Sequence, residues 1–182
     1  ESGLLYPFVL WGPPGTGKTT LANIVASQSN LEFFPFSAVL SGMKEVKDIM
    51  ARARKIKNVS GKATVVFIDE IHRFNKAQQD AFLPYVERGD IVLLGATTEN
   101  PSFEIRSALL SRLQVYITHP LDHQAIEQLL ARAIEQDKWI ASLNIAIPEE
   151  TRLLIAQKNP GDARSALTLL ETALSTHTDE TL

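Results

Sequence analysis

Short apolar runs alternate along the first two thirds of the chain with segments whose apolar residues recur every three or four positions. The runs fall at Phe8–Trp11, 31–36, Thr64–Asp69, 91–96 and 114–118, and they predict five strands. The helical spacing falls after residue 20 and over 43–56, 76–87 and 107–112. Strands that alternate with helices form a parallel, doubly wound sheet, so the pattern predicts an α/β fold.

Local residue patterns also predict where several of the helices begin. Asn75 followed by Gln78 predicts a capping box at the start of the third helix. After residue 120 only helical spacing remains: one helix over His123–Gln136, a second that starts at Pro148, and a last one capped by Asp162. We therefore expect an α/β core over residues 1–120 and a small all-helical part over 121–182.

A glycine-rich loop separates the first strand from the first helix. Its residues are Gly12, Pro13, Pro14, Gly15, Thr16, Gly17, Lys18, Thr19 and Thr20. Glycines let backbone N–H groups point inward as an anion-binding nest, and the helix N-terminus adds partial positive charge. We expect Lys18 to reach the β- and γ-phosphates of a nucleotide and Thr19 to bind Mg²⁺. The alternative is a turn with a chance lysine, which the order strand, loop, helix disfavours.

Two carboxylates follow the apolar run of the third strand. Ligands of open parallel sheets bind at the carboxyl ends of strands, where the glycine-rich loop also lies. We expect Asp69 to hold Mg²⁺, directly or through water, and Glu70 to act as the general base that activates water. The alternative is a solvated acidic turn. An acid pair 50 residues after a phosphate-binding loop is typical of nucleotide hydrolysis.

Composition narrows the class of protein. The chain has 182 residues, of which 45% are hydrophobic and 21% charged, as in an ordinary globular protein. It has no cysteine, which excludes disulfides and thiolate metal sites, and no apolar run of the roughly 18 residues that a membrane span needs. We expect a cytoplasmic protein with no membrane partner.

Charge gives one local signal. The net charge of −3 provides no overall attraction for nucleic acid. Seven of the 18 basic residues nevertheless fall in one stretch, at Lys44, Lys47, Arg52, Arg54, Lys55, Lys57 and Lys62. This stretch is either a DNA-facing patch or a solvated helix face.

With both nucleotide motifs and the helical C-terminal part in place, the chain resembles AAA+ ATPases. Residues 67–76 (Phe-Ile-Asp-Glu-Ile-His-Arg-Phe-Asn-Lys) and 95–103 (Gly-Ala-Thr-Thr-Glu-Asn-Pro-Ser-Phe) are similar to the RarA/MgsA family. Its members are bacterial replication-associated recombination ATPases related to the eukaryotic Werner-helicase-interacting protein. The resemblance implies a P-loop NTPase fold with a five-stranded parallel sheet in the order 5-1-4-3-2 and a helical lid. It also implies an ATPase core fragment, in which the family's segment before the first strand is absent or reduced to residues 1–7 and its C-terminal oligomerisation region is absent.

The resemblance further implies three residues that complete the site. The polar residue ending the fourth strand, sensor 1 of the family, falls on Thr98, with Thr97 the neighbouring candidate. Arg112 matches the arginine finger that reaches the γ-phosphate held by the next subunit, with Arg106 as a rival. Arg164 matches the sensor-2 arginine, which touches the γ-phosphate of its own subunit and also belongs to the nucleotide-binding set.

The function implied is Mg²⁺-dependent ATP hydrolysis by a homo-oligomer, a tetramer or a ring, acting on forked, gapped or single-stranded DNA. Replication, recombination and repair are the expected settings, at the nucleoid, with single-strand-binding protein among the partners. Two alternatives stay open. One is a clamp-loader or branch-migration subunit, and the other is a nucleotide-gated interaction module with little turnover.

Overall fold

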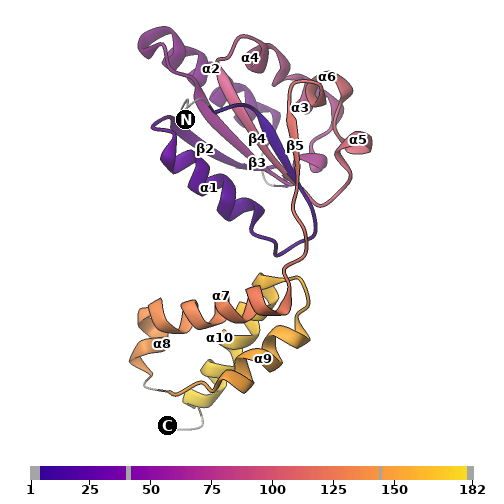
Figure 1. Cartoon of the computed structure of the whole chain (residues 1–182). Helices are drawn as coiled ribbons and strands as arrows, with labels where there is room; N and C mark the ends of the chain where they lie inside the picture. The colour runs from indigo at the N-terminus through magenta and orange to yellow at the C-terminus, as the bar shows by residue number, and fades with distance from the viewer. Residues whose placement is uncertain (1–4, 40–41, 144, 180–182) are drawn as a thin grey trace. The chain divides into compact units, whose positions relative to one another are not determined.

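A computed structural model of the chain describes residues 5–39, 42–143 and 145–179 (Figure 1). The chain divides into two compact units. The first comprises residues 1–12 and 18–118, and the second comprises residues 13–17 and 119–182. Among the described helices, none has the length and hydropathy that a membrane span requires.

The first unit is built on a parallel sheet. Its strands are β1 (Phe8–Trp11), β2 (Glu32–Ser37), β3 (Thr64–Asp69), β4 (Ile91–Thr97) and β5 (Gln114–Ile117). They lie in the order β2-β3-β4-β1-β5, so the expected order 5-1-4-3-2 is confirmed, read from the other edge. Leu10 of β1 pairs with Ala96 of β4, and Ile68 of β3 pairs with Gly95. This register brings the carboxyl ends of β1, β3 and β4 to one edge of the sheet.

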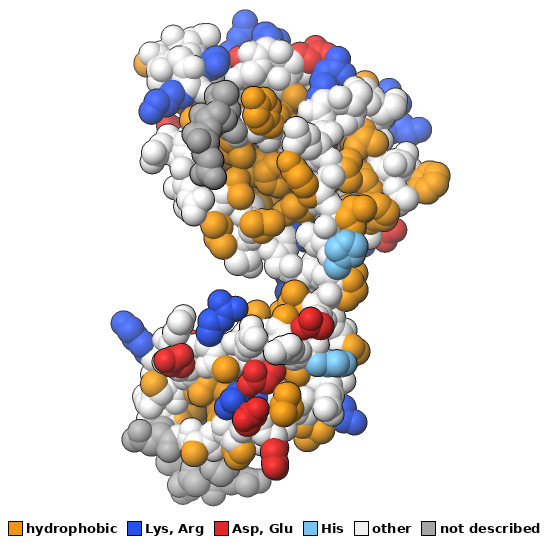
Figure 2. Space-filling view, in the orientation of Figure 1, with side chains coloured by type: hydrophobic (Ala, Val, Ile, Leu, Met, Phe, Trp, Pro, Cys, Tyr) orange, Lys and Arg blue, Asp and Glu red, His pale blue; other side chains and the backbone are white. Residues whose placement is uncertain are grey.

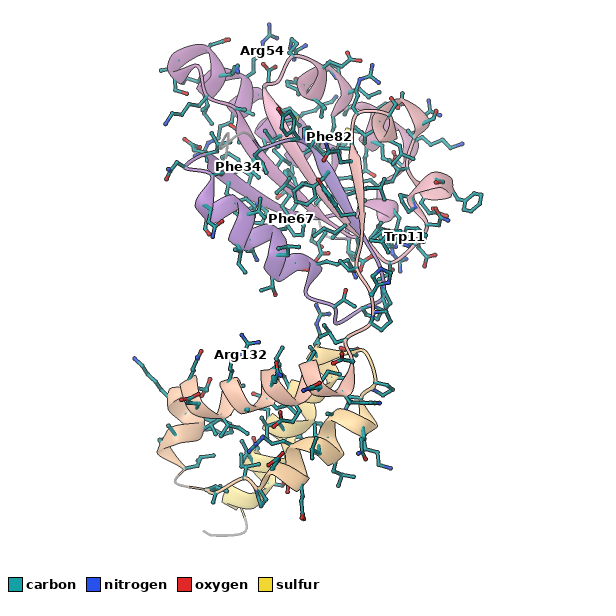
Figure 3. The ribbon with its side chains drawn as sticks, viewed as in Figure 1. Trp11, Phe34, Arg54, Phe67, Phe82 and Arg132 are labelled. Atoms are coloured by element: carbon teal, nitrogen blue, oxygen red, sulfur yellow. The ribbon has the colours of Figure 1, made fainter. Side chains whose placement is uncertain are left out.

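Helices cover both faces of this sheet (Figure 1). They are α1 (Lys18–Gln28), α2 (Met43–Ser60), η1 (Ile71–Arg73), α3 (Lys76–Asp80), α4 (Leu83–Glu87), α5 (Pro101–Glu104) and α6 (Ser107–Leu110). On one face, α1 packs through Ala22 and Ala26. On the other, α2 and α6 pack around Phe82. Figure 3 labels one aromatic side chain from each core cluster, Phe67 and Phe82.

The inward face of α1 is not the one that its larger apolar residues indicate. The helical spacing after residue 20 predicts that Leu21, Ile24 and Val25 define the packed side, and of these Val25 is partly buried against the core. Leu21 and Ile24 remain 44% and 48% exposed, whereas Ala22 and Ala26 are buried. The small side chains let the helix backbone approach the sheet closely, which the hydrophobic periodicity alone does not distinguish.

The helix predicted over 76–87 is instead two short helices, α3 and α4. Pro84 explains the break, because it has no N–H to donate and its ring clashes with the carbonyl four residues earlier. The expected capping box is confirmed: Asn75 Oδ1 accepts the Gln78 N–H and Gln78 Oε1 accepts the Asn75 N–H, both at 2.9 Å. Ala77, expected to face inward, is exposed, and Gln79 is buried in this segment.

The second unit holds four helices among its described residues. They are α7 (His123–Gln136), α8 (Lys138–Ser142), α9 (Glu149–Lys158) and α10 (Ala163–Asp179). Ile126 and Leu130 of α7, Ile155 of α9, and Ala166 and Leu170 of α10 form its core. The helices start where the sequence predicts: Asp122 caps α7, Pro148 precedes α9 and Asp162 precedes α10. The helix α8 was not predicted.

Candidate nucleotide-binding site

Gly12 and Lys18 form the base of the glycine-rich loop. The Gly12 N–H donates to the Thr97 carbonyl at 3.2 Å, which ties the loop to the end of β4. A Cβ at Gly12 would clash with the carbonyl and hydroxyl of Thr118, so only glycine fits there. Lys18, the first residue of α1, is only 8% exposed, and its Nζ donates to the Gly12 carbonyl at 2.8 Å. A lysine so buried is unusual and concentrates positive charge beneath the loop.

The middle of the loop belongs to the second unit. Thr16 Oγ1 donates to the Pro13 carbonyl at 3.0 Å, and the Ala163 N–H donates to the Gly15 carbonyl at 3.2 Å. Gly17 has φ +83°, a left-handed conformation that favours glycine. Pro14 is exposed, as is Thr20 on α1 of the first unit. The loop backbone is thus held by one hydrogen bond within the loop and one from the start of α10.

Thr19 and Asp69 meet at the end of β3. Thr19 Oγ1 donates to Asp69 Oδ2 at 3.2 Å, and Asp69 Oδ1 accepts the Glu70 N–H at 3.1 Å. Hydroxyl and carboxylate oxygens are the hard donors that Mg²⁺ prefers, so this pair fits the ion. Within residues 5–39, 42–143 and 145–179, no three His, Cys, Asp or Glu side chains converge as a metal site. A magnesium ion bound here would therefore take its other ligands from phosphate and water, as it commonly does.

Glu70 adopts an unusual backbone conformation directly after β3. Its φ of 54° and ψ of 48° are left-handed, which for a residue other than glycine costs on the order of 1–3 kcal/mol. Its Oε2 is buried and has no hydrogen-bond partner within the described part of the chain. That atom lies 3.2 Å from His72 Nδ1, but the two groups are not aligned for a hydrogen bond. Strained backbone and an unsatisfied buried oxygen together are typical of a functional carboxylate.

Of the two neighbouring threonines, Thr97 is the one connected to the acid pair. It ends β4, is fully buried, and its Oγ1 lies 2.9 Å from His72 Nδ1. The same oxygen accepts the Glu99 N–H at 3.0 Å. Thr98 is half-buried and lies one residue beyond the strand.

Both candidate finger arginines form ion pairs within their own chain. Arg112 pairs with Glu87, and its guanidinium also donates to the Ala108 carbonyl. Arg106 pairs with Asp80, with 3.2 Å between Nε and Oδ1. Each arginine side chain is nevertheless partly exposed.

In the second unit, Arg164 lies exposed in the first turn of α10, beside the helix cap Asp162. Asp162 Oδ1 accepts the backbone N–H of Ser165 at 3.1 Å, and Oδ2 accepts the Ser165 hydroxyl at 2.9 Å. The backbone hydrogen bond from Ser165 is the largest cause that holds the pKa of Asp162 below its ordinary value, and the Arg164 charge acts in the same direction.

The model of the ATPase family associated with various cellular activities (AAA) matches residues 8–121. The chain belongs to the AAA family. Membership supports ATP binding and hydrolysis as the activity of the glycine-rich loop and the acid pair.

Individual relatives are consistent with this family. The chain is 52% identical over 172 residues to replication-associated recombination protein A of Escherichia coli, covering 94% of this chain and 38% of that protein. It is 45% identical to ATPase WRNIP1 of Dictyostelium discoideum, over 99% of this chain and 20% of that one. These identities confirm the resemblance carried by residues 67–76 and 95–103. The chain thus spans well under half the length of these relatives.

A solved structure confirms the fold. The RuvB Holliday junction branch migration motor of Thermotoga maritima has a TM-score of 0.74 and 28% identity, over 92% of this chain and 53% of that one. The P-loop α/β core with a helical second part is therefore shared with other AAA ATPases.

The sequence indicates that His72, two residues after the acid pair, either shapes the water site or is a hydrogen-bonded turn histidine, and it does not identify Gln79. His72 links the acid pair to β4, and buried Gln79 donates to the carbonyls of Phe74 and Glu104, both at 3.0 Å. Gln79 Oε1 also accepts the Arg106 N–H at 2.8 Å, which holds the segment leading to α6. A polar residue inside a predicted amphipathic helix was the available signal for Gln79. For His72, the sequence signal was its position two residues after the acid pair.

Proposed function

We propose that this AAA chain hydrolyses ATP to drive work on DNA during replication and recombination. The observation that carries the proposal is the 3.2 Å approach of Thr19 Oγ1 to Asp69 Oδ2 at the rim of the sheet. It joins the phosphate-binding loop to the acid pair, and nucleotide hydrolysis requires both.

In this proposal the loop of residues 12–20 cradles the triphosphate through its backbone N–H groups. Lys18 exchanges its bond to the Gly12 carbonyl for the β- and γ-phosphate oxygens. Thr19 and Asp69 hold Mg²⁺, which supplies charge neutralisation between the β- and γ-phosphates when bound. Arg164 contributes a further positive charge from the lid.

Glu70 acts as the general base. It takes one proton from a water molecule whose oxygen forms a bond to the γ-phosphorus. The bond from that phosphorus to the β,γ-bridging oxygen breaks, and its electron pair stays on ADP. Inorganic phosphate is the other product. Thr98, or its neighbour Thr97, orients the water or the γ-phosphate through its hydroxyl.

A homo-oligomer, a tetramer or a ring, completes the site. Arg112 leaves Glu87 and neutralises charge on the γ-phosphate of the neighbouring subunit. A finger supplied in this way is worth about 10³–10⁵ in rate. The isolated chain is then a poor ATPase whose turnover per subunit rises with concentration.

A DNA partner is supported by similarity to replication-associated recombination protein A and by the charge on α2. At 100° per residue, Lys44, Lys47, Arg54 and Lys55 share an arc of about 100° on this helix, with Asp48 beside the arc next to Lys55 and Glu45 farther round. The four basic side chains are exposed and form no ion pair among the described residues. Lys and Arg side chains line this edge in Figure 2, and Figure 3 shows Arg54 projecting outward.

These four residues, here called the basic stripe, extend over 12 residues, or about 17 Å of helix from first to last. Such a stripe suits the phosphates of forked, gapped or single-stranded DNA, which need only positive charge. Single-strand-binding protein is a partner at the same DNA, and repair is a further setting. The nucleoid, within the cytoplasm, is the proposed location.

A branch-migration role is the second candidate, favoured by the structural likeness to the RuvB motor. The experiment that tests the main proposal is steady-state phosphate release by the purified protein, with Mg²⁺, at increasing protein concentration. It is run without DNA and with single-stranded, gapped and forked DNA, and with a four-way junction. Stimulation by forks or gaps supports the proposal, and selective stimulation by the junction supports branch migration. ATP binding without turnover under every condition would identify a nucleotide-gated interaction module instead.

A further inference from the structure

One ring nitrogen, His72 Nδ1, lies between the acid pair and the end of β4. It is 3.2 Å from Glu70 Oε2 and 2.9 Å from Thr97 Oγ1. The His72 side chain is mostly buried in η1, directly after the left-handed Glu70. One oxygen from the residue after β3 and one from the end of β4 therefore lie close to the same nitrogen.

The surroundings of Thr97 determine which atom carries the proton. Its Oγ1 accepts the Glu99 N–H at 3.0 Å and donates to the Glu99 carbonyl at 3.2 Å. With the hydroxyl proton directed at the Glu99 carbonyl, Nδ1 is assigned as the donor in the contact with His72. An Nδ1–H group is also the nearest donor to Glu70 Oε2, the buried oxygen that lacks a hydrogen bond.

We propose that His72 is a positioning residue for the general base Glu70. Its Nδ1–H group, which is hydrogen-bonded to Thr97 and lies 3.2 Å from Glu70 Oε2, attracts that oxygen electrostatically toward β4 and leaves the other carboxylate oxygen to accept the water proton. This inference rests on the proposed ATP hydrolysis and adds a residue to that site.

The proposal predicts different effects of a His72 substitution on ATP binding and on the rate of hydrolysis. His72 contacts the base and the end of β4. Losing the Nδ1–H donor therefore misorients Glu70 while ATP still binds. We expect His72→Ala to lower kcat about tenfold, less than the ~10²–10⁴ that a positioned general base contributes. The KM for ATP should change by less than about twofold, because ground-state binding is retained.

The sharpest comparison is between two amide substitutions. The Asn side-chain N–H₂ reaches the position of Nδ1, whereas that of Gln reaches the position of Nε2. His72→Asn should retain kcat within about twofold, and His72→Gln should resemble His72→Ala. Exposed His119→Asn is the matched control and should behave as the wild type. If His72→Ala does not fold, the Asn and Gln variants still decide the matter. Equal kcat values for these two variants would overturn the proposal.

A second measurement does not depend on turnover. Nitrogen-15 NMR of the imidazole should show His72 with a protonated Nδ1, and Thr97→Val should shift that resonance. A proton on Nε2 alone overturns the positioning role, even in an active enzyme. A protein that shows the Nδ1–H signal but hydrolyses no ATP instead refutes the proposed function and leaves the His72 link to Thr97 intact.

Discussion

Thr19 Oγ1 donates a hydrogen bond to Asp69 Oδ2 at 3.2 Å, although 50 residues separate them in the sequence. Thr19 lies in the first turn of α1 and Asp69 ends β3, so the contact joins two elements that form independently. The pair presents two oxygens at the point where a phosphate-binding loop meets an acid pair. Removal of either oxygen should therefore weaken Mg²⁺ binding and slow hydrolysis.

Asp69→Asn should lower kcat by at least about 100-fold, because a neutral amide binds Mg²⁺ far more weakly than a carboxylate. Thr19→Val should weaken Mg²⁺-dependent binding about tenfold or more. Titration of a fluorescent ATP analogue with Mg²⁺ and with EDTA measures both. Exposed Thr168→Val is the matched control for the hydroxyl. Wild-type Mg²⁺ dependence in both site variants would exclude this pair as the metal ligands.

Glu70→Gln should bind ATP as tightly as the wild type and lose about 10²–10⁴ in kcat. The amide keeps the shape of the carboxylate but cannot accept a proton from water. Phosphate release and analogue binding, measured on the same preparation, separate the two effects. Unchanged turnover in this variant would rule out Glu70 as the base.

A mixture of Arg112→Ala and Glu70→Gln proteins should recover activity that neither variant has alone. A site on the first variant keeps its base and receives an intact finger from its Glu70→Gln neighbour. Each variant alone should lose roughly 10²-fold or more in rate. The same mixture with Arg106→Ala tests the rival finger. Recovery with Arg106→Ala and none with Arg112→Ala would transfer the role to Arg106.

Replacing Lys47, Arg54 and Lys55 of the basic stripe by Gln should weaken DNA binding and lower its salt dependence. Each lost phosphate contact reduces the slope of log K against log salt by about 0.7 for single strands and 0.9 for duplex. The control variant replaces three exposed lysines outside the stripe by Gln, which removes the same amount of charge; they are Lys76, Lys138 and Lys158. Fluorescence anisotropy with labelled DNA measures both proteins. An equal loss in the control would mean that net charge, and not the stripe, sets the affinity.

Asp162→Ala should destabilise the lid by about 1 kcal/mol at neutral pH, because α10 loses its N-cap. In the wild type, hydrogen bonds from Ser165 hold the pKa of Asp162 below its unfolded value. The ionised carboxylate therefore contributes stability above the unfolded pKa, and this contribution is lost as the pH falls below about 4. Asp162→Asn keeps the cap without the charge. Thermal unfolding between pH 6 and pH 3 should show a smaller acid-induced decrease for Asn than for the wild type.

Much of the fold was predictable because local patterns and tertiary packing agree. The strands Phe8–Trp11 and Thr64–Asp69 and the helix His123–Gln136 have the bounds that their periodicity indicates. The capping box at Asn75 is a local hydrogen-bond arrangement, so residues three apart were enough to identify it. The glycine-rich loop and the acid pair were recognisable for the same reason, since each is contiguous in the chain.

The sequence by itself determined which residues carry the chemistry, because Lys18, Asp69 and Glu70 belong to short contiguous motifs. Only the tertiary structure decided how they are arranged. The pairing of β3 with β4 brings His72 beside Thr97, and the choice of Ala22 over Leu21 as the buried residue of α1 came from close packing against the sheet. Contacts between residues far apart in the chain depend on register and side-chain volume, and a one-dimensional pattern contains neither.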